Sequence, residues 1–482
     1  MASEVDMGRG SVTDLPTAAP TGTARHRRPE PRRHAATAET GRLPTGPGRR
    51  RGDFAAAAAG IGGGLAVGSA LVVLQPTWST PGGPATVIGA ATAIAGTYLC
   101  LILLLLVSRL PWLEREAGHD RMLAWHRKAA PWSLLLIGAH VLFTTWGYAL
   151  GAGVSPAREL WNLVTVYPWM VPAALAFIAM VSLGVISWRP IRTRMTYETW
   201  WVAHLYFYIA VALAFGHQIN SGLLFTTHTG LRYGWITLYV LVAVTILTCR
   251  VLLPLRLSIR HQLRVSHVVN EAPGVVSVYL AGKELASLNA AGGQFFQWRF
   301  LTRHWWWQAH PYSLSAVPSG EYLRITVKRL GDQSGNLARA LRPGTRVVAE
   351  GPYGTFTAKS RVGERVVAFA AGVGITPIRA VLDDLPVTTD VTVVYRVSSL
   401  DRIALKDELE AVTAACGWQL IYLDGPRQRH PMTLNYLTRF VPDLSDRDVY
   451  VCGPSPFADS VLAVARAANV PEARLHCESF SF

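Results

Sequence analysis

A long uncharged run near the start of the chain limits what this protein can fold into. No Asp, Glu, Lys or Arg occurs between Phe54 and Ser108, although the 482 residues include 46 Lys or Arg and 31 Asp or Glu. A helix needs roughly 20 apolar residues to cross a bilayer core, so this run is too long for one span. Pro, Gly, Ser and Thr interrupt it at 75–84, which predicts two membrane helices, at about 54–74 and 85–107.

Four further apolar segments, at about 123–149, 161–188, 198–219 and 233–250, bring the expected number of spans to six. The mean hydropathy of +0.24 agrees and excludes both a disordered chain and an ordinary soluble domain. The polar tail 1–53 precedes the first span, so that span is not expected to be a cleaved signal peptide. The tail is rich in Pro, Thr, Ala and Arg, and we expect it to be disordered.

The basic residues of the connecting segments predict the orientation of the spans. Ten Arg lie in 1–53, five Lys or Arg in 109–128, three in 189–194 and four in 250–264, against only Arg158 and Arg232 in the alternate loops. Cytoplasmic loops collect Lys and Arg, so both termini are expected in the cytoplasm of a multi-pass cell-membrane protein. The net charge of +15 therefore indicates a lipid bilayer as partner and requires no nucleic acid.

Four histidines lie inside the expected spans: His126 and His140 on the third, His204 and His217 on the fifth. A single histidine can simply hydrogen-bond between helices, but two matched pairs favour a functional site. Spacings of fourteen and thirteen residues correspond to roughly 21 and 19.5 Å of helix, so the pairs define two levels across the bilayer. Two neutral imidazoles facing each other are what a six-coordinate haem iron needs, whereas zinc needs more ligands or an open position.

Helix geometry fits these two pairs unequally. At 100° per residue, fourteen steps return to within about 40° of the same face, whereas thirteen steps miss it by about 140°. Pro131 also interrupts the third span and can kink it. Two stacked b-type haems need both histidines of a span on the same face. Ideal helix geometry supports this for the pair on the third span and does not prove it for the pair on the fifth.

Beyond residue 264 the sequence takes on the pattern of a soluble protein. Alternating segments at 275–280 and 322–328, separated by Pro-Gly and Gly-Gly turns, predict a small antiparallel β-barrel. From about 363, strands at 365–370, 391–395, 419–423 and 449–452 alternate with helices at 378–385 and 404–415, which predicts a parallel α/β domain. We therefore expect a tail (1–53), a six-helix membrane domain (54–256), a β-barrel domain (257–362) and an α/β domain (363–482).

The turn after the first of these parallel strands predicts a nucleotide site. Gly372 and Gly374 would let the backbone approach a pyrophosphate at a helix N-terminus, although a tight turn alone can also use two glycines. Arg396 follows the second strand, where the adenosine ribose usually lies, and Arg402 is nearby. A guanidinium there suits a 2′-phosphate and favours NADPH over NADH, unless these arginines are merely solvated.

The soluble half resembles the ferredoxin–NADP reductase superfamily, and with the histidine pairs the resemblance extends over 54–482 and matches the ferric reductase and NADPH oxidase group. The motifs occur in the order of that family: Gly293-Gln294-Phe295, His310-Pro311-Tyr312-Ser313-Leu314, Gly331-Asp332-Gln333-Ser334-Gly335, Gly351-Pro352-Tyr353-Gly354, the turn from Gly372 to Thr376 and Pro377, Cys452-Gly453-Pro454, and Glu478-Ser479-Phe480-Ser481-Phe482. The resemblance implies an FAD-binding barrel followed by an NAD(P)H-binding domain.

The resemblance also implies roles for single residues. Tyr312 and Ser313 would contact the flavin ring, and Ser334 with Gly335 would open a helix on the FAD pyrophosphate. Further cofactor contacts would come from Gln294, Phe295, His310, Pro311, Leu314, Thr376, Pro377, Gly453 and Pro454. Cys452 would line the nicotinamide pocket with Glu478 close by. Phe482 would stack on the flavin until the nicotinamide displaces it.

Taken together, these features predict a flavocytochrome that passes electrons from cytosolic NADPH through FAD and two haems to a one-electron acceptor outside, either ferric chelate or oxygen. The outer loops are short and carry no acidic cluster that would hold iron, and no obligatory protein partner is evident. Two rival interpretations stay open. The chain can be a membrane electron-transfer subunit that feeds an extracytoplasmic enzyme, or a membrane-anchored flavin reductase without haem.

The terminal aromatic residue gives a first test. Deleting Phe482 should change the preference between NADPH and NADH, because the ring would no longer compete with the nicotinamide for the flavin face. Steady-state kinetics with both nucleotides measure this. Unchanged kinetics would reduce the residue to part of a frayed terminus.

Overall fold

The computed structural model describes residues 76–117, 119–303, 305–329 and 340–480, with residues 57, 58, 60–62, 64, 65, 68 and 72. The tail 1–53, much of the expected first span at 54–74, and Ser334, Gly335 and Phe482 lie outside the described residues. Within the described part, five helices are long and apolar enough to cross a membrane. The predicted number of six is therefore not reached there, because the first span falls largely outside it.

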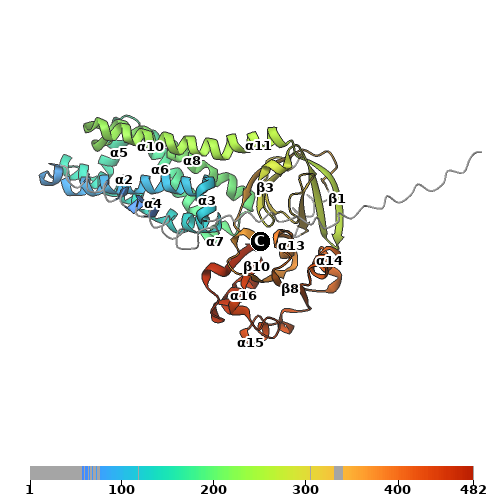
Figure 1. The fold of residues 1–482 in the computed structure, drawn as a ribbon. Coiled ribbons are helices and arrows are strands. Elements are labelled where there is room, and N and C mark those ends of the chain that lie inside the picture. Colours follow the sequence, from blue (N-terminus) through green and yellow to red (C-terminus); the bar gives the residue numbers. More distant parts are fainter. Residues whose placement is uncertain are drawn as a thin grey trace, which may run out of the picture. The chain divides into compact units, whose positions relative to one another are not determined.

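The five candidate spans run side by side in Figure 1. They are built on the helices α2 (Gly83–Val107), α4 (His119–Ala152), α6 (Met170–Ser187), α8 (Tyr197–Ser221) and α10 (Thr229–Leu247). Shorter elements connect them: η1 (Pro76–Ser79), α3 (Pro111–Ala117), α5 (Pro156–Val166), α7 (Arg189–Arg192) and α9 (Leu223–Thr227). α2 lies close along α4, and α6 lies close along α8.

The expected span at 161–188 is wrong in its extent, because the structure divides it into α5 and α6. Tyr167 is extended, with φ −83° and ψ 143°, as a residue before proline prefers. Pro168 follows it, and Trp169 takes a left-handed conformation with φ 64° at the start of α6. The helix therefore ends before Pro168 and begins again after it, and the span is the 18 residues of α6.

The last span continues further than the sequence indicated. α10 passes through a π-helical turn, η2 (Thr248–Leu252), into α11 (Leu253–His261), so that one apolar helical stretch covers Thr229–His261. Pro254 is the second residue of α11, just after the π-helical turn. Proline has no N–H to donate to the carbonyl four residues earlier, and a π turn accommodates such a break without ending the helix.

Small residues allow the close approach of α2 to α4. The buried Gly89 faces Thr144, and a Cβ added to this glycine would lie 2.4 Å from the Thr144 side-chain oxygen. A Cβ on Gly96, seven residues later, would lie 3.0 Å from the side chains of Leu136 and Ile137. Glycine at these positions therefore sets the distance between the two helices, as small residues do in membrane bundles.

Two three-stranded antiparallel sheets follow the helices, with orders β1-β2-β5 and β4-β3-β6. Their strands are β1 (Arg264–Ala272), β2 (Val275–Ala281), β3 (Phe295–Phe300), β4 (His310–Ser313), β5 (Leu323–Lys328) and β6 (Val347–Tyr353). Isolated bridges from Arg264 to Arg346 and from Leu314 to Ile325 join the two sheets. Where a continuous barrel was expected, this antiparallel domain thus has two sheets around one apolar core that includes Phe296, Trp298 and Phe300.

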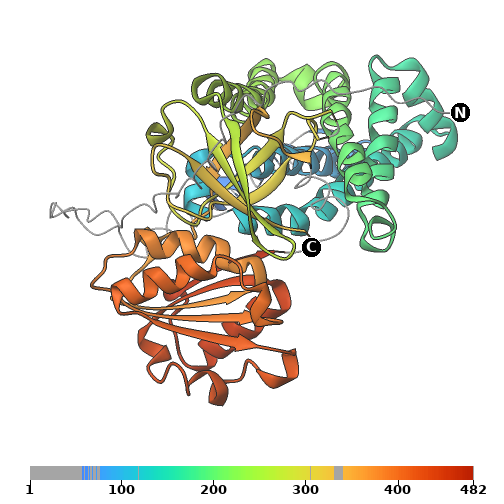
Figure 2. The same ribbon diagram turned by 90° about the vertical axis from the view of Figure 1, so that its right-hand side faces the viewer.

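The parallel domain is a five-stranded parallel sheet of order β11-β10-β7-β8-β9, with helices on both faces (Figure 2). Its strands are β7 (Arg365–Ala371), β8 (Asp390–Val397), β9 (Gln419–Asp424), β10 (Asp448–Pro454) and β11 (Leu475–Phe480), and its main helices are α13 (Ile375–Asp384), α14 (Lys406–Cys416) and α16 (Ser455–Ala467). The alternating side chains of β7 supply both faces, since Val366 and Ala368 pack with α13, and Val367 and Phe369 pack with α16. The predicted parallel α/β fold is thus confirmed. The sequence pattern missed the edge strand β11.

The contact between α2 and α4 leads to a stability prediction. Gly89→Ala should destabilise the protein by about 1–3 kcal/mol, the usual cost of overpacking a tight interface. Gly234→Ala on α10 is the matched control, because a Cβ there meets nothing within 4 Å. Thermal unfolding of the detergent-solubilised protein compares the two, and equal midpoints would contradict the proposed role of Gly89.

Candidate functional site

The structure brings the four membrane histidines together in two pairs, both between α4 and α8. The ring centroids of His126 and His204 lie 6.2 Å apart, with 68° between the ring planes. Those of His140 and His217 lie 6.4 Å apart, with 26° between the planes. The thirteen-residue spacing on α8 therefore does not prevent pairing at both levels.

Neighbouring groups fix the orientation of three of these rings. Nδ1 of His126 lies 3.2 Å from the carbonyl oxygen of Leu103, and Nδ1 of His140 lies 2.9 Å from that of Gly89. Nδ1 of His204 lies 3.2 Å from the hydroxyl of Ser187. A carbonyl only accepts, so Nδ1 of His126 and of His140 carries the proton and their Nε2 atoms keep a free lone pair.

The groups that orient these rings were missed by the sequence analysis. Two are backbone carbonyls of α2, which carry no sequence signal of their own. The spacing of Gly82, Gly89 and Gly96 was the available clue, because a glycine stripe indicates a helix face that another helix approaches closely. α4 and α8 do not approach each other as closely as α4 approaches α2.

The residues of the motif 310–314 lie at the junction of the two antiparallel sheets. The rings of His310 and Tyr312 are stacked with 7° between their planes, and Pro311 is exposed. Burial raises the pKa of Tyr312 to about 12, so its hydroxyl stays protonated at neutral pH. Ser313 and Leu314 are buried.

The turn before β3 is tied to the end of β6. The side chain of Gln294 accepts a hydrogen bond from the Ala291 amide at 2.9 Å and donates to the Gly354 carbonyl at 3.2 Å. The ring of Phe295 lies 5.7 Å from that of Tyr353. Two separate motifs of the sequence therefore form one side of the antiparallel domain.

A hydrogen bond joins the antiparallel domain to the end of the chain. The Ser313 hydroxyl donates to Oε1 of Glu478 at 2.9 Å. Glu478 lies on β11 in register with Cys452 of β10, which is fully buried. Burial, and after it the charge of Glu478, raises the pKa of the Cys452 thiol well above its usual value. The Glu478 carboxylate thus lies beside the serine that the resemblance places at the flavin, and the neutral Cys452 thiol belongs to the residue paired with Glu478 on the next strand.

The glycine turn after β7 lies against the end of β10. A Cβ on Gly374 would lie 2.2 Å from the Cys452 carbonyl oxygen, so only glycine fits there. Gly372 has φ +57°, and its carbonyl accepts a hydrogen bond from the buried Tyr395 hydroxyl at 3.0 Å. The first turn of α13 supports this arrangement from within, because Thr376 donates to the Val373 carbonyl at 2.9 Å.

The remaining members of the predicted nucleotide site lie at the carboxyl edge of the parallel sheet. Pro377 is buried in the first turn of α13. Gly453 packs against Ala371, and Pro454 ends β10. Arg396 lies near the end of β8 in register with Ala371, one residue before the glycine turn, whereas Arg402 is exposed in the short helix η6 (Leu400–Arg402). The structure therefore brings Arg396 close to the glycine turn at the carboxyl edge of the sheet and leaves Arg402 on the surface.

An ion pair that the sequence analysis did not predict connects the two soluble domains. The guanidinium of Arg324 on β5 binds both carboxylate oxygens of Glu408 on α14, at 2.5 and 2.9 Å. Burial alone would raise the pKa of Glu408, but the contacts with Arg324 hold it below its usual value. Such a bidentate pair fixes orientation as well as distance.

A buried carboxylate links the helical part to the antiparallel domain. Glu350 on β6 is 2% exposed and forms ion pairs with Arg109 at 3.3 Å, Arg250 at 2.8 Å and Arg299 at 3.6 Å. Arg109 follows α2 and Arg250 lies in the π-helical turn, whereas Arg299 belongs to β3. The hydroxyl of Tyr353 also donates to Glu350, at 3.1 Å.

The charge of Arg109 is stabilised by its neighbours, among them the carboxylate of Glu350. Burial lowers the pKa of Arg109, but Glu350, Tyr353 and Glu114 together outweigh burial, and the resulting pKa lies above its usual value. Arg109 also lies 4.7 Å from the centre of the Tyr353 ring, a cation–π distance. Tyr353 belongs to the predicted motif 351–354. The ion pairs of Glu350 therefore connect the helical part directly to one of the motifs predicted for cofactor binding.

Comparison with known families assigns a class to each part of this arrangement. The model of the ferric reductase like transmembrane component matches residues 92–215, that of an FAD-binding domain matches 263–357, and that of an oxidoreductase NAD-binding domain matches 369–462. The chain is therefore an NAD(P)H-dependent oxidoreductase with a membrane domain. Its domain order is that of the fused ferric reductase and NADPH oxidase superfamily, as the sequence resemblance predicted.

Individual relatives match parts of the chain. A flavohemoprotein of Vibrio cholerae is 33% identical over 181 residues, which are 35% of this chain and 45% of the relative. The NADH oxidoreductase HCR of Escherichia coli is 27% identical over 219 residues, covering 43% and 65% of the two chains. The chain thus spans about half the length of the first of these relatives. Among solved structures, the FAD/NAD-binding domain of a Vibrio cholerae nitric oxide dioxygenase is 24% identical, with a TM-score of 0.39, over 46% of this chain and 99% of that chain.

The buried carboxylate gives the prediction of this subsection. Glu350→Ala should lower the free energy of unfolding by about 3–5 kcal/mol, because it leaves the buried Arg109 without its partner. Glu284→Ala is the matched control. Its carboxylate also pairs with an arginine, Arg260 at 2.8 Å, but is 60% exposed, so its loss should cost less than about 1 kcal/mol. Thermal unfolding measures both, and a similar small effect of the two substitutions would show that Glu350 is not a structural link.

Proposed function

We propose that the protein is a transmembrane flavocytochrome that moves electrons from cytosolic NADPH, through FAD and two b-type haems, to a one-electron acceptor on the other side of the membrane. The observation that carries the proposal is the presence of two imidazole pairs at two levels between the same two helices. We also propose the domain boundaries 54–256, 257–362 and 363–482 for the haem, FAD and nucleotide domains.

The spacing of each pair fits a metal ion between the rings. Metal–nitrogen bonds of about 2.0 Å, with roughly 1.1 Å from each nitrogen to its ring centre, put two ring centroids roughly 6 Å apart. The observed separations are 6.2 and 6.4 Å. No group of three His, Cys, Asp or Glu side chains suited to a metal occurs among the described residues. A haem, which brings four nitrogens of its own, would be held by two imidazoles, and each pair offers two.

The chain's own residues hold these ligands in the required state. The carbonyls of Leu103 and Gly89 keep the proton on Nδ1 of His126 and His140, so each Nε2 offers its lone pair. His204 is oriented by Ser187. The inner pair would be His126 with His204, and the outer pair His140 with His217. The guanidinium of Arg192 lies 4.3 Å from the ring centre of Trp200, which is one helical turn before His204. Arg192 would therefore be placed to bind a propionate of a haem held by His204.

At the flavin, Ser313 and Glu478 would hold and move a proton near the reacting edge, since their side chains share a hydrogen bond. Tyr312 would contact the ring, and Phe482 would cover its other face. When bound, FAD accepts a two-electron hydride from NADPH and passes on single electrons, which is the form in which haem iron accepts them. The neutral Cys452 thiol, Gly453 and Pro454 would shape the nicotinamide pocket and exclude water from it.

At the nucleotide, Gly372 and Gly374 would let the pyrophosphate approach the start of α13. Arg396 would bind a 2′-phosphate, and Ser334 with Gly335 would bind the FAD pyrophosphate.

The protein would lie in the cell membrane with both termini on the cytoplasmic side, as the basic loops indicate. Ferric chelate and oxygen are the two acceptors that we propose, because each accepts one electron at a time.

The second interpretation is a haem-free, membrane-anchored flavin reductase, and a third is an electron-transfer subunit for an extracytoplasmic enzyme. The haem-to-flavin ratio of the purified protein separates the first two, and we expect a value of two. Turnover in proteoliposomes then compares superoxide with Fe(II) as the product. Rapid reduction of oxygen or Fe(III)-chelate by the isolated protein would argue against the third interpretation.

Substitution of one outer ligand tests the relay. His140→Ala should remove about one of the two haems and leave reduction of FAD by NADPH intact. His140 belongs to the membrane domain, whereas FAD and NADPH would bind to the soluble domains. The exposed His228, in the outer loop, provides the control His228→Ala, which should keep both haems. Pyridine haemochrome spectra give the stoichiometry, and full haem retention in His140→Ala would exclude the assignment.

Substitution of one arginine tests the nucleotide preference. Arg396→Ala should raise the KM for NADPH about tenfold or more and leave the KM for NADH nearly unchanged, because a charged hydrogen bond to the 2′-phosphate is lost. Arg365→Ala, at the amino end of β7 and thus the opposite edge of the sheet, should affect neither. Equal effects of Arg396→Ala on both nucleotides would mean that other residues read the phosphate.

A further inference from the structure

The loop between β3 and β4, residues 301–309, contains three consecutive tryptophans. Trp305 packs against the core of the antiparallel domain, with its ring centroid 5.8 Å from that of His310. Trp306 and Trp307 are 60% and 36% exposed. The loop is therefore fastened to its own domain by the first indole and presents the next two outward.

The outward side of this loop meets the surface of a candidate span. Trp307 lines an apolar hollow together with Thr199, Val202, Ala203 and Tyr206 of α8. Thr199 begins the apolar stretch by which α8 can cross a membrane. Val202 and Tyr206 are 43% and 56% exposed, as expected for side chains that face lipid. The loop thus continues the lipid-facing surface of α8.

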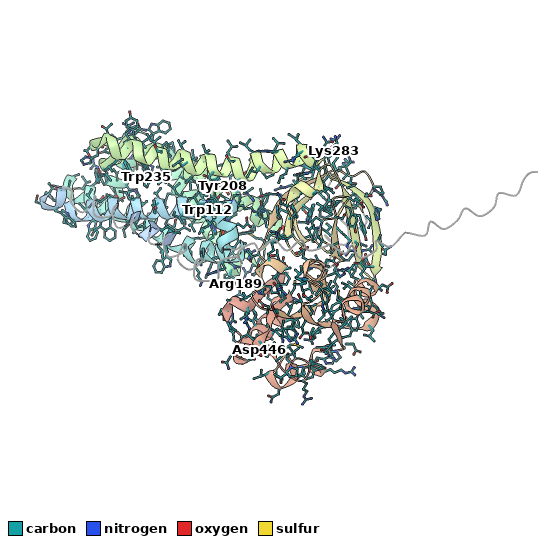
Figure 3. The ribbon with its side chains drawn as sticks, in the orientation of Figure 1. Trp112, Arg189, Tyr208, Trp235, Lys283 and Asp446 are labelled. Carbon is teal, nitrogen blue, oxygen red and sulfur yellow. The ribbon has the colours of Figure 1, made fainter. Side chains whose placement is uncertain are left out.

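Other exposed tryptophans mark the same level of the bundle. Trp188 is 65% exposed and follows Ser187, whose hydroxyl accepts a hydrogen bond from Trp200 of α8. It therefore lies beside the turn of α8 that Trp307 also approaches. Trp112, 60% exposed, follows the end of α2, and Figure 3 places it with Arg189 toward the soluble end of the bundle. Tryptophans collect in this way at membrane–water interfaces.

The composition of the loop suits the same surroundings. Among the residues of the loop that the structure describes, the exposed side chains are Leu301, Arg303, Trp306 and Trp307. An indole has an apolar body and one N–H donor, and a guanidinium binds lipid phosphate, so this combination fits the boundary between headgroups and acyl chains. Exposed to water, the same surface would be an unfavourable apolar patch.

We propose that the β3–β4 loop is a peripheral membrane contact, in which Trp306 and Trp307 insert into the headgroup region of the leaflet on the His126–His204 side. The partner is lipid, because the loop extends a surface that α8 already offers to lipid. The contact holds the motif 310–314, which directly follows the loop, at the membrane surface. The proposal requires neither haem nor a particular acceptor, so it can fail while the proposed function holds, and the reverse.

Tryptophan fluorescence of the full chain in lipid nanodiscs tests this contact. The chain has 16 tryptophans, so the signal of the loop is obtained as the difference between the wild type and Trp306→Phe/Trp307→Phe. We expect this difference spectrum to be quenched by lipids brominated near the headgroup and protected from aqueous acrylamide. Phenylalanine keeps the loop apolar, and the single substitutions Trp306→Phe and Trp307→Phe give the same information if the double variant does not fold.

Trp418→Phe is the control, because Trp418 is 8% exposed within the parallel domain and its difference spectrum should respond to neither quencher. Quenching of the loop difference by acrylamide alone would place the two indoles in water and overturn the proposal. Quenching by neither reagent would mean that protein covers the loop, which would overturn it as well.

Discussion

The placement of the soluble module against the membrane helices depends on one buried carboxylate. Glu350 lies among three guanidinium groups, of which two come from the helical part and one from β3. Three cations would repel one another in a site with little water, so the group is stable only when the carboxylate is present. The ends of α2 and α10 are therefore held to β6 by charge pairing that requires all partners at once. Pro254 contributes indirectly, since the π turn before it contains Arg250.

Within the bundle, close helix packing decides the orientation of the histidines. Glycines on α2 bring its backbone near α4, where the Gly89 carbonyl accepts from His140. On the other side, Ser187 at the end of α6 lies against His204. Neighbours in two helix pairs, α2 with α4 and α6 with α8, thus orient three of the four ligands that we propose for haem. Each pair supplies one ring at each level.

The soluble module shows the same dependence on contacts that are distant in the sequence. Ser313 and Glu478 are 165 residues apart and share a hydrogen bond. Arg324 and Glu408 orient the antiparallel domain relative to the parallel domain. The reacting edge of a flavin and a nicotinamide must meet in a defined geometry, because a misplacement of about 1 Å can lower a rate about a hundredfold. Contacts of this kind provide that precision.

Local pattern determined much of the architecture: apolar runs predicted the membrane helices, alternation predicted the antiparallel strands, and the glycine turn predicted the start of α13. These features depend on the hydrophobic effect and on backbone geometry within a few turns, which a sequence displays directly. Local signals also explain the errors. Pro168 could have ended the helix at 166, whereas the edge strand β11, of sequence Leu-His-Cys-Glu-Ser-Phe, has only a weak alternating pattern of its own.

The sequence by itself also determined which residue types lie at the candidate site, namely four histidines at two spacings and the ordered motifs of the soluble half. Only the tertiary structure decided which groups surround them. The Leu103 and Gly89 carbonyls, the partners of Glu350 and the surface beside Trp307 become neighbours through packing between distant segments. Such neighbours depend on the relative positions of whole helices and sheets, and no local pattern in the chain records those positions.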